Sequence, residues 1–212
     1  RSEPAMAERG RGVPWSLRLA ERASLAGVWF GGALVILAAF LIGYDVVVRK
    51  LFNITVGGAD ELSGYALAIG TTWSLGFTLL HRAHIRIDSL YIHFPRPMRA
   101  ALDILGLAAF VAVFGLVAWY GWGMVADTAA MGARSMSPLS TPLIIPQSLW
   151  FAGLVLFLAV AALLLLHAVL ALLRGDLGTV QTIAGSRSIK EEIADELPPG
   201  HEDGGEGARR TA

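Results

Sequence analysis

The sequence contains no cysteine and has almost no ionisable side chain inside its longest apolar runs. Without cysteine the chain can form no disulfide, no thiolate nucleophile and no cysteine-ligated metal site. Only Asp45 and His167 lie well inside the apolar runs, and Asp103 lies at the end of one. Ionisable groups at membrane depth usually mark an ion or substrate pathway. Their scarcity indicates that the chain does not itself carry ions or a charged substrate across a bilayer.

Charge is also scarce overall and balanced in sign. Charged residues make up 16% of the 212 residues and hydrophobic residues 55%, while 17 basic residues balance 17 acidic ones. This composition is too apolar for a soluble domain of this size and predicts an integral membrane protein. A net charge of zero gives no indication of a nucleic-acid partner.

Four apolar runs are long enough to cross a membrane as helices. Each reaches the ~20 residues that span ~30 Å of hydrocarbon. The runs are Leu25–Val48, Leu62–Leu80, Leu102–Val125 and Ile144–Leu173. We therefore predict an all-α integral membrane protein with four transmembrane helices within residues 25–173. A cytoplasmic segment, residues 1–24, precedes them, and a polar, largely disordered tail, residues 174–212, follows.

The basic residues are unevenly distributed among the connecting segments. Of the 17 Lys and Arg residues, 14 lie before the first run, between the second and third, or after the fourth. The positive-inside rule therefore places both termini in the cytoplasm. Within the N-terminal segment, Trp15, Leu19 and Ala23 recur at helical spacing beside Arg18 and Arg22. This pattern predicts either an amphipathic interfacial helix or a frayed start of the first spanning helix.

The second and fourth runs differ in the side chains that they offer to neighbours. Small residues recur every four positions in the second run, in two series: Ala66, Gly70, Ser74 and Gly64, Ala68, Thr72, Gly76. Such spacing lets helix backbones approach closely. We predict that the second helix is the one most surrounded by protein, either of this chain or of a partner. The Leu-rich run 154–173 is predicted to face lipid.

The connection between the third and fourth runs is predicted to lie at the outer membrane surface. Trp119, Tyr120 and Trp122 close the third run, and Trp150 and Phe151 open the fourth, as expected of an aromatic belt. Between these groups, residues 131–146 are rich in proline, serine and threonine. That composition predicts an ordered turn or an extended loop.

Charged residues flank the turn between the first two runs. Asp45 and Arg49 are four residues apart, which predicts an ion pair on one helix face. Asp60 and Glu61 begin the second run on the same membrane side, where carboxylates suit a helix N-terminus. We predict that they complete a charged network with Arg49 and Lys50.

The histidines offer an alternative that involves a cofactor. His81 and His84 follow the second run, and His167 lies near the same membrane face, so a haem-binding membrane anchor of a respiratory complex stays open. Against this alternative, His81 and His84 belong to a basic loop, whereas haem ligands usually lie deeper on facing helices. The sequence offers no nucleophile–base pair and no cluster of metal ligands. We therefore predict no enzymatic activity, no catalytic residue, no cofactor and no metal site.

The helices also argue against a transporter that works alone. Such proteins usually contain broken helices in repeated halves, with polar groups at mid-membrane. The four runs here are mostly uninterrupted. An accessory or scaffolding subunit fits this pattern better than an autonomous channel or carrier.

Short motifs, in their order and spacing, resemble a known family. They are Arg49-Lys-Leu-Phe52-Asn53, Ala59-Asp-Glu61-Leu62, His84-Ile-Arg-Ile-Asp88 and Ile145-Pro146. The first two lie on either side of the first turn, the third follows the second run, and the last enters the fourth. From about Leu25 to Leu173 this pattern is similar to the small membrane (DctQ-type) subunit of tripartite ATP-independent periplasmic (TRAP) transporters.

The resemblance implies an accessory role in the inner membrane of a bacterial cell. Such subunits brace a large permease subunit for sodium-coupled uptake, a symport, of an organic acid that a periplasmic binding protein delivers. The implied partners are the large permease subunit, the periplasmic binding protein and membrane lipid. The residues expected to be partner-binding or structural are Arg49, Phe52, Asn53, Glu61, His84 and Asp88, together with Ala66, Gly70 and Ser74 from the small-residue series. None is expected to bind substrate.

Overall fold

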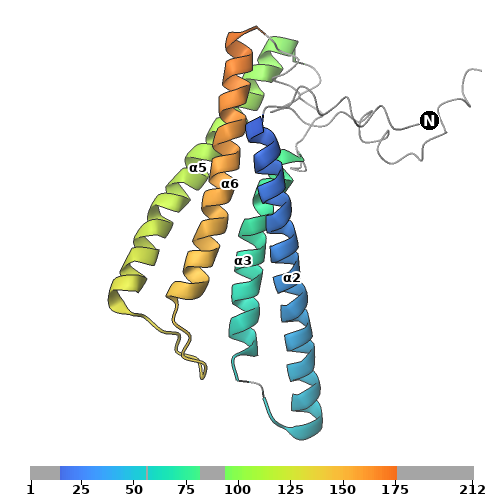
Figure 1. Cartoon of the computed structure of the whole chain (residues 1–212), viewed down its shortest axis with the longest axis vertical. Coiled ribbons are helices and arrows are strands. Elements are labelled where there is room, and N and C mark those ends of the chain that lie inside the picture. The colour runs from blue at the N-terminus through green and yellow to red at the C-terminus, as the bar shows by residue number, and fades with distance from the viewer. Residues whose placement is uncertain (1–14, 56, 82–93, 176–212) are drawn as a thin grey trace, which may run out of the picture.

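The computed structural model describes residues 15–55, 57–81 and 94–175. Its helices are α2 (Trp15–Phe52), α3 (Ala59–Leu80), α5 (Arg96–Met131) and α6 (Ile144–Leu173). Successive helices run in opposite directions (Figure 1). The all-helical prediction is confirmed, and α6 has the predicted bounds. Helices α2 and α5 extend beyond their apolar runs at both ends.

Three of the four helices are long and apolar enough to cross a membrane. They are α2, α5 from Pro97 onward, and α6. Helix α3 has 22 residues but does not reach the same hydropathy, because Gly, Ser and Thr take the place of larger apolar side chains along it. The prediction of spanning helices is thus confirmed for three. That α3 is a fourth span, and that both termini are cytoplasmic, stay predictions.

Helix α2 runs without interruption through the boundary predicted at residue 24. Its 38 residues correspond to a length of about 57 Å at 1.5 Å per residue. The hydrocarbon core of a bilayer is ~30 Å thick, so the helix must tilt strongly or extend beyond the core. Residues 15–23 are therefore the first turns of the first spanning helix and form no separate interfacial helix.

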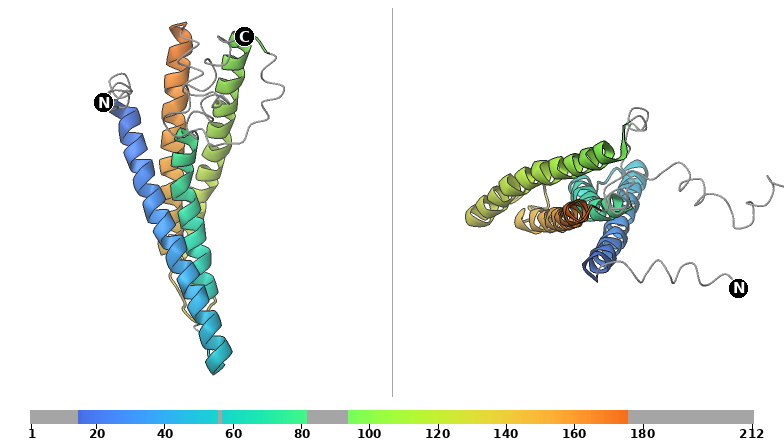
Figure 2. Two further views of the ribbon diagram at one scale, coloured as in Figure 1. Left: turned by 90° about the vertical axis from the view of Figure 1, so that its right-hand side faces the viewer. Right: turned by 90° about the horizontal axis from the view of Figure 1, so that it is seen from above.

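Helix α3 makes the most extensive contacts with the rest of the described chain, as predicted. Helix α6 contacts each of the other three helices, α2 less extensively than α3 and α5. Helix α5 reaches the other helices chiefly through α6 and diverges from them toward Met131 (Figures 1 and 2). The main buried cluster consists of Phe157, Val160, Ala161, Leu164 and Ala168 of α6 with Leu79 of α3 and Leu107 of α5.

The prediction that the Leu-rich run 154–173 faces lipid is therefore wrong for one side of α6, whereas Leu166 and Leu170 on its other side are exposed. In α6, 39% of the most apolar stretch is buried inside the protein, against 17% in α2 and in α5. The physical reason is that lipid tails are as apolar as leucine, so composition does not distinguish a lipid-facing helix from a central one.

Glycines allow α2 and α3 to approach to backbone contact. A Cβ atom on Gly31 would lie 2.7 Å from the carbonyl oxygen of Gly70. A Cβ atom on Gly27 would lie 2.6 Å from the carbonyl oxygen of Trp73. Side chains larger than hydrogen are thus excluded at both positions of α2. Gly70, from one of the two small-residue series, packs within this chain.

Helix α3 also packs closely on α6. A Cβ atom on Gly153 of α6 would lie 2.6 Å from Thr72 Oγ1. The indole Nε1 of Trp73 donates a hydrogen bond to the carbonyl oxygen of Leu149 at 2.9 Å. Helix α3 therefore packs closely on both α2 and α6.

Candidate functional site

A polar cluster joins the start of α3 to the loop between α5 and α6, residues 132–143. Its members, here called the Glu61 cluster, are Glu61, Tyr65, Ser135, Ser137 and Thr141. The hydroxyl of Ser137 donates to Glu61 Oε2, and the hydroxyl of Tyr65 donates to Glu61 Oε1 at 2.6 Å. The hydroxyls of Ser135 and Ser137 lie 2.9 Å apart, and the Thr141 N–H donates to Ser135 Oγ at 3.2 Å. The carboxylate therefore ties α3 to the loop.

The hydrogen bonds to Glu61 favour its ionised form. The hydrogen bond from the Ser137 hydroxyl has the largest effect, followed by that from the Tyr65 hydroxyl. Together they lower the pKa of Glu61 from 4.5 to about 2. Glu61 also lies in the first turn of α3, where the helix dipole favours negative charge. At neutral pH this group is a carboxylate that accepts hydrogen bonds.

The predicted charged network is correct in one part and wrong in another. Arg49 forms an ion pair with Asp45, whose side chain is buried, as predicted. Across the described ranges, however, Glu61 makes no ion pair with Arg49 or Lys50. One carboxylate oxygen accepts from Ser137 of the 132–143 loop and the other from Tyr65 of α3, so both oxygens are already satisfied.

The 132–143 loop is held by its own backbone as well as by Glu61. The Ser135 N–H donates to the carbonyl of Thr141 at 2.9 Å, and the Leu143 N–H donates to that of Ala133 at 3.0 Å. The Arg134 guanidinium donates to the carbonyl of Ser140 at 3.0 Å. These bonds confirm the predicted ordered loop.

The tip of the loop contacts the turn that precedes α3. Gly58, which immediately precedes α3, has φ 93°, a left-handed conformation that glycine adopts without strain. A Cβ atom there would lie 1.7 Å from Leu139 Cδ1, so the leucine occupies the space beside the glycine. Pro138 lies next to Gly57: a Cβ atom built on Gly57 would lie 3.5 Å from the Cβ atom of Pro138. Backbone shape and side-chain packing thus position the loop together.

The other predicted residues lie apart from the Glu61 cluster. Phe52 is the last residue of α2 and is exposed. Asn53 ends that helix in a left-handed conformation with φ 56°, which asparagine tolerates better than most residues. Ala66 and Gly70 are buried, and the Ser74 hydroxyl donates to the carbonyl of Gly70 at 2.8 Å. His84 and Asp88 lie outside the described residues.

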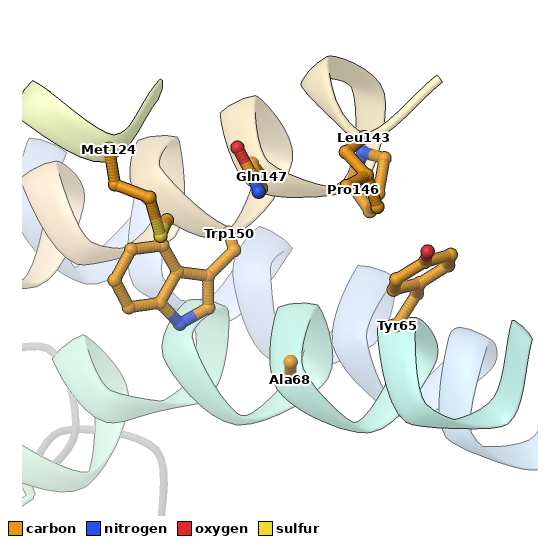
Figure 3. A pocket seen from close by; sticks show the side chains of 7 residues that line it. All are labelled: Tyr65, Ala68, Met124, Leu143, Pro146, Gln147 and Trp150. Carbon is orange, nitrogen blue, oxygen red and sulfur yellow. The ribbon is translucent and has the colours of Figure 1, made fainter. Parts of the chain in front are cut away.

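An apolar cavity of about 290 Å³ opens between α3, α5 and α6 beside the Glu61 cluster (Figure 3). The residues that line it are Tyr65, Ala68, Met124, Leu143, Pro146, Gln147 and Trp150. Tyr65 belongs to both the cavity and the cluster. The buried Gln147 Oε1 has no hydrogen-bond partner among the described residues.

The histidine contacts give no support to the haem alternative. The rings of His81 and Phe77 have centroids 4.0 Å apart, and His167 Nδ1 lies 2.8 Å from the carbonyl oxygen of Leu163. Within the ranges that the structure describes, no three His, Cys, Asp or Glu side chains come together in a way that could hold a metal ion.

Sequence reasoning missed the partners of Glu61, the cavity and the glycines of α2. Gly27 and Gly31 have the four-residue spacing that was recognised in the second run, so this signal was present in the first run also. The serines at 135 and 137 were recognised only as loop residues, and nothing in their spacing relates them to Glu61.

Fold and site together define an all-helical integral membrane protein. Its described contacts hold α2, α3 and α6 together and attach the 132–143 loop to α3. The family model described as "Tripartite ATP-independent periplasmic transporters, DctQ component" matches residues 38–175. The chain belongs to this DctQ family, and the resemblance recognised from the motifs is confirmed. Membership makes it the small permease subunit of a TRAP transporter and an inner-membrane protein. No curated protein and no solved structure matches the chain.

Proposed function

We propose that this chain is a non-catalytic brace for the large permease subunit of a TRAP transporter. The large subunit would carry out sodium-coupled uptake of an organic acid that a periplasmic binding protein delivers. The family match over residues 38–175 is the observation that carries this proposal. The match includes α3, α5 and α6 in full and α2 from Ala38 onward, so it contains the Glu61 cluster and the cavity.

The packing of the helices supports a bracing role. A brace must keep its shape while its partner moves, and membrane helices are held together mainly by close packing. Here α2 and α3 meet at backbone contact, α6 lies at the centre of the core, and Glu61 fixes the 132–143 loop. The described contacts thus join the helices and the loop into one unit.

The cavity between α3, α5 and α6 is the surface that we assign to the large subunit. It is lined mainly by apolar side chains, among them Met124, Pro146 and Trp150. An apolar side chain of a partner helix would fill this volume by close packing.

Copurification with the large subunit tests this assignment. The chain is coexpressed with a tagged large permease subunit, and the amount retained on the tag is measured. Ala68→Phe, which fills the cavity, should reduce retention. Ala39→Phe, the same change at an exposed position of α2, should not. Equal retention of the two variants would place the contact elsewhere, and no retention of the unmodified chain would remove the proposed function.

Reconstitution tests the transport role directly. In proteoliposomes the chain alone should move no solute, whereas the large subunit, the binding protein and this chain together should give sodium-dependent uptake. Glu61→Gln should reduce assembly or uptake and leave the order of preference among organic acids unchanged. A changed preference would assign Glu61 to substrate selection and contradict a purely structural role.

A further inference from the structure

The first turns of α2 hold a pocket with two arginine side chains. The pocket has a volume of about 180 Å³ and is lined by Trp15, Arg18, Leu19 and Arg22. These residues recur at spacings of three and four, so they share one side of the helix. The family match begins at residue 38, and the pocket therefore lies outside the part of the chain that defines the family.

The opposite side of the same turns is anchored in the bundle. Leu17 and Ala20 pack against the main hydrophobic cluster, and Ser24 is fully buried. The first turns of α2 are thus packed against the bundle on one side. Their other side presents the two guanidinium groups away from the bundle, and both arginines are exposed.

Neither Arg18 nor Arg22 forms an ion pair within the part of the chain that the structure describes. Guanidinium groups bind phosphate oxygens through charge-assisted, often bidentate hydrogen bonds. The indole of Trp15, 72% exposed, lies beside them, and tryptophan is enriched at the level of lipid headgroups. The pocket therefore suits a phosphate group at a membrane surface.

After Arg22, toward the C-terminal end of α2, the same side of the helix carries only apolar residues. The residues that continue the spacing are Ala26, Trp29, Ala33, Ile36 and Phe40. Trp29 and Phe40 are 75% and 73% exposed. Trp29 follows Arg22 by about 10 Å along the helix axis, well within the ~15 Å depth of one leaflet. A ligand with an anionic head and long apolar tails matches both parts of this side, whereas a soluble phosphate matches only the first.

We propose that this pocket binds an anionic phospholipid. Arg18 and Arg22 hold the headgroup phosphate, Trp15 and Leu19 border it, and the acyl chains lie along the Trp29 side of α2. The bound lipid would hold the first turns of α2 at the level of the headgroups, just before the apolar run that begins at Leu25.

Lipid titration of the full-length chain in detergent tests the proposal, with bound lipid counted by native mass spectrometry. Phosphatidylglycerol should bind more tightly than phosphatidylcholine. Arg18→Gln combined with Arg22→Gln should weaken phosphatidylglycerol binding on the order of 20- to 30-fold, because each basic residue near the surface contributes about fivefold. Arg18→Lys combined with Arg22→Lys should weaken binding less than the Gln pair does, since the charge is kept and only the bidentate hydrogen bonds are lost.

A matched control removes two other positive charges. Lys50→Gln combined with Arg174→Gln changes two exposed basic residues at the ends of α2 and α6 and should leave binding unchanged. Equal binding of the two lipids, or equal losses in the two Gln pairs, would overturn the proposal. Displacement of phosphatidylglycerol by millimolar inorganic phosphate would also overturn it and identify a site for a soluble anion. Circular dichroism verifies that each variant remains helical.

Discussion

A single added methyl group at Gly31 tests whether α2 and α3 are held at backbone contact. The new Cβ atom would lie 2.7 Å from the carbonyl oxygen of Gly70 and 2.9 Å from its Cα atom. Nonbonded carbon atoms prefer separations of about 3.5–4.0 Å, so the two helices must move apart by roughly 1 Å or bend. Overpacking of this kind lowers the free energy of unfolding by about 1–3 kcal/mol.

Gly32 provides a matched control in the next position of the same helix. A Cβ atom on Gly32 has no atom of the protein within 4 Å. Both Gly→Ala changes improve intrinsic helix propensity by up to ~1 kcal/mol, so this gain cancels in the comparison. Gly31→Ala should therefore be less stable than Gly32→Ala by about 1–3 kcal/mol, which is the packing cost alone.

The assay is the free energy of unfolding of the purified chain in mixed micelles, from circular dichroism during titration with a denaturing detergent. A double variant adds a second criterion. Gly70→Ala combined with Gly31→Ala should lose less stability than the sum of the single losses, because the first methyl group already separates the helices. Equal stability of Gly31→Ala and Gly32→Ala would refute backbone contact at this crossing.

Two further perturbations examine α6 and the Glu61 cluster. Phe157→Ala should lower the free energy of unfolding by about 3–5 kcal/mol, since Phe157 is fully buried and its ring centroid lies 4.6 Å from that of Phe114. Leu166→Ala, at an exposed position of the same helix, should change it by less than about 1 kcal/mol, and similar losses in the same titration would contradict the burial of one side of α6. For Glu61, the folded pKa of about 2 lies below the ordinary 4.5, so its contribution to stability is complete above pH 4.5 and is lost as the pH falls toward 2. The melting temperature should fall more steeply on acidification in the unmodified chain than in Glu61→Gln, and parallel curves would show that Glu61 carries none of this dependence.

The helices were predictable because each one follows from the length and composition of a single continuous stretch of sequence. An apolar run of sufficient length gives a helix, and the bounds of α6 agree with the run from which it was predicted. The ion pair of Asp45 with Arg49 was predictable for the same reason, since the two residues are neighbours on one helix face. Contacts set by the spacing within one helix can be derived from sequence.

Contacts between distant segments could not be derived in this way. Glu61 bonds to Ser137, 76 residues further along the chain, and no periodicity relates the two positions. The resemblance to the DctQ family drew attention to Glu61, but its position on the same membrane side as Arg49 led to the wrong prediction that the two would pair. The burial of one side of α6 was missed because a protein core and a lipid bilayer select the same side chains.

The two proposed contacts use different helices, which makes them separable. The arginine pocket lies on the outward side of α2, whereas the cavity lies between α3, α5 and α6. Because α3 joins α2 to α6 at close contact, a change at one surface moves the other only if the bundle itself deforms. Ala68→Phe should therefore retain phosphatidylglycerol, and Arg18→Gln with Arg22→Gln should retain the large subunit. Loss of both activities in either variant, with helicity intact, would mean that lipid and partner share one surface, and the large subunit would then have to lie along α2.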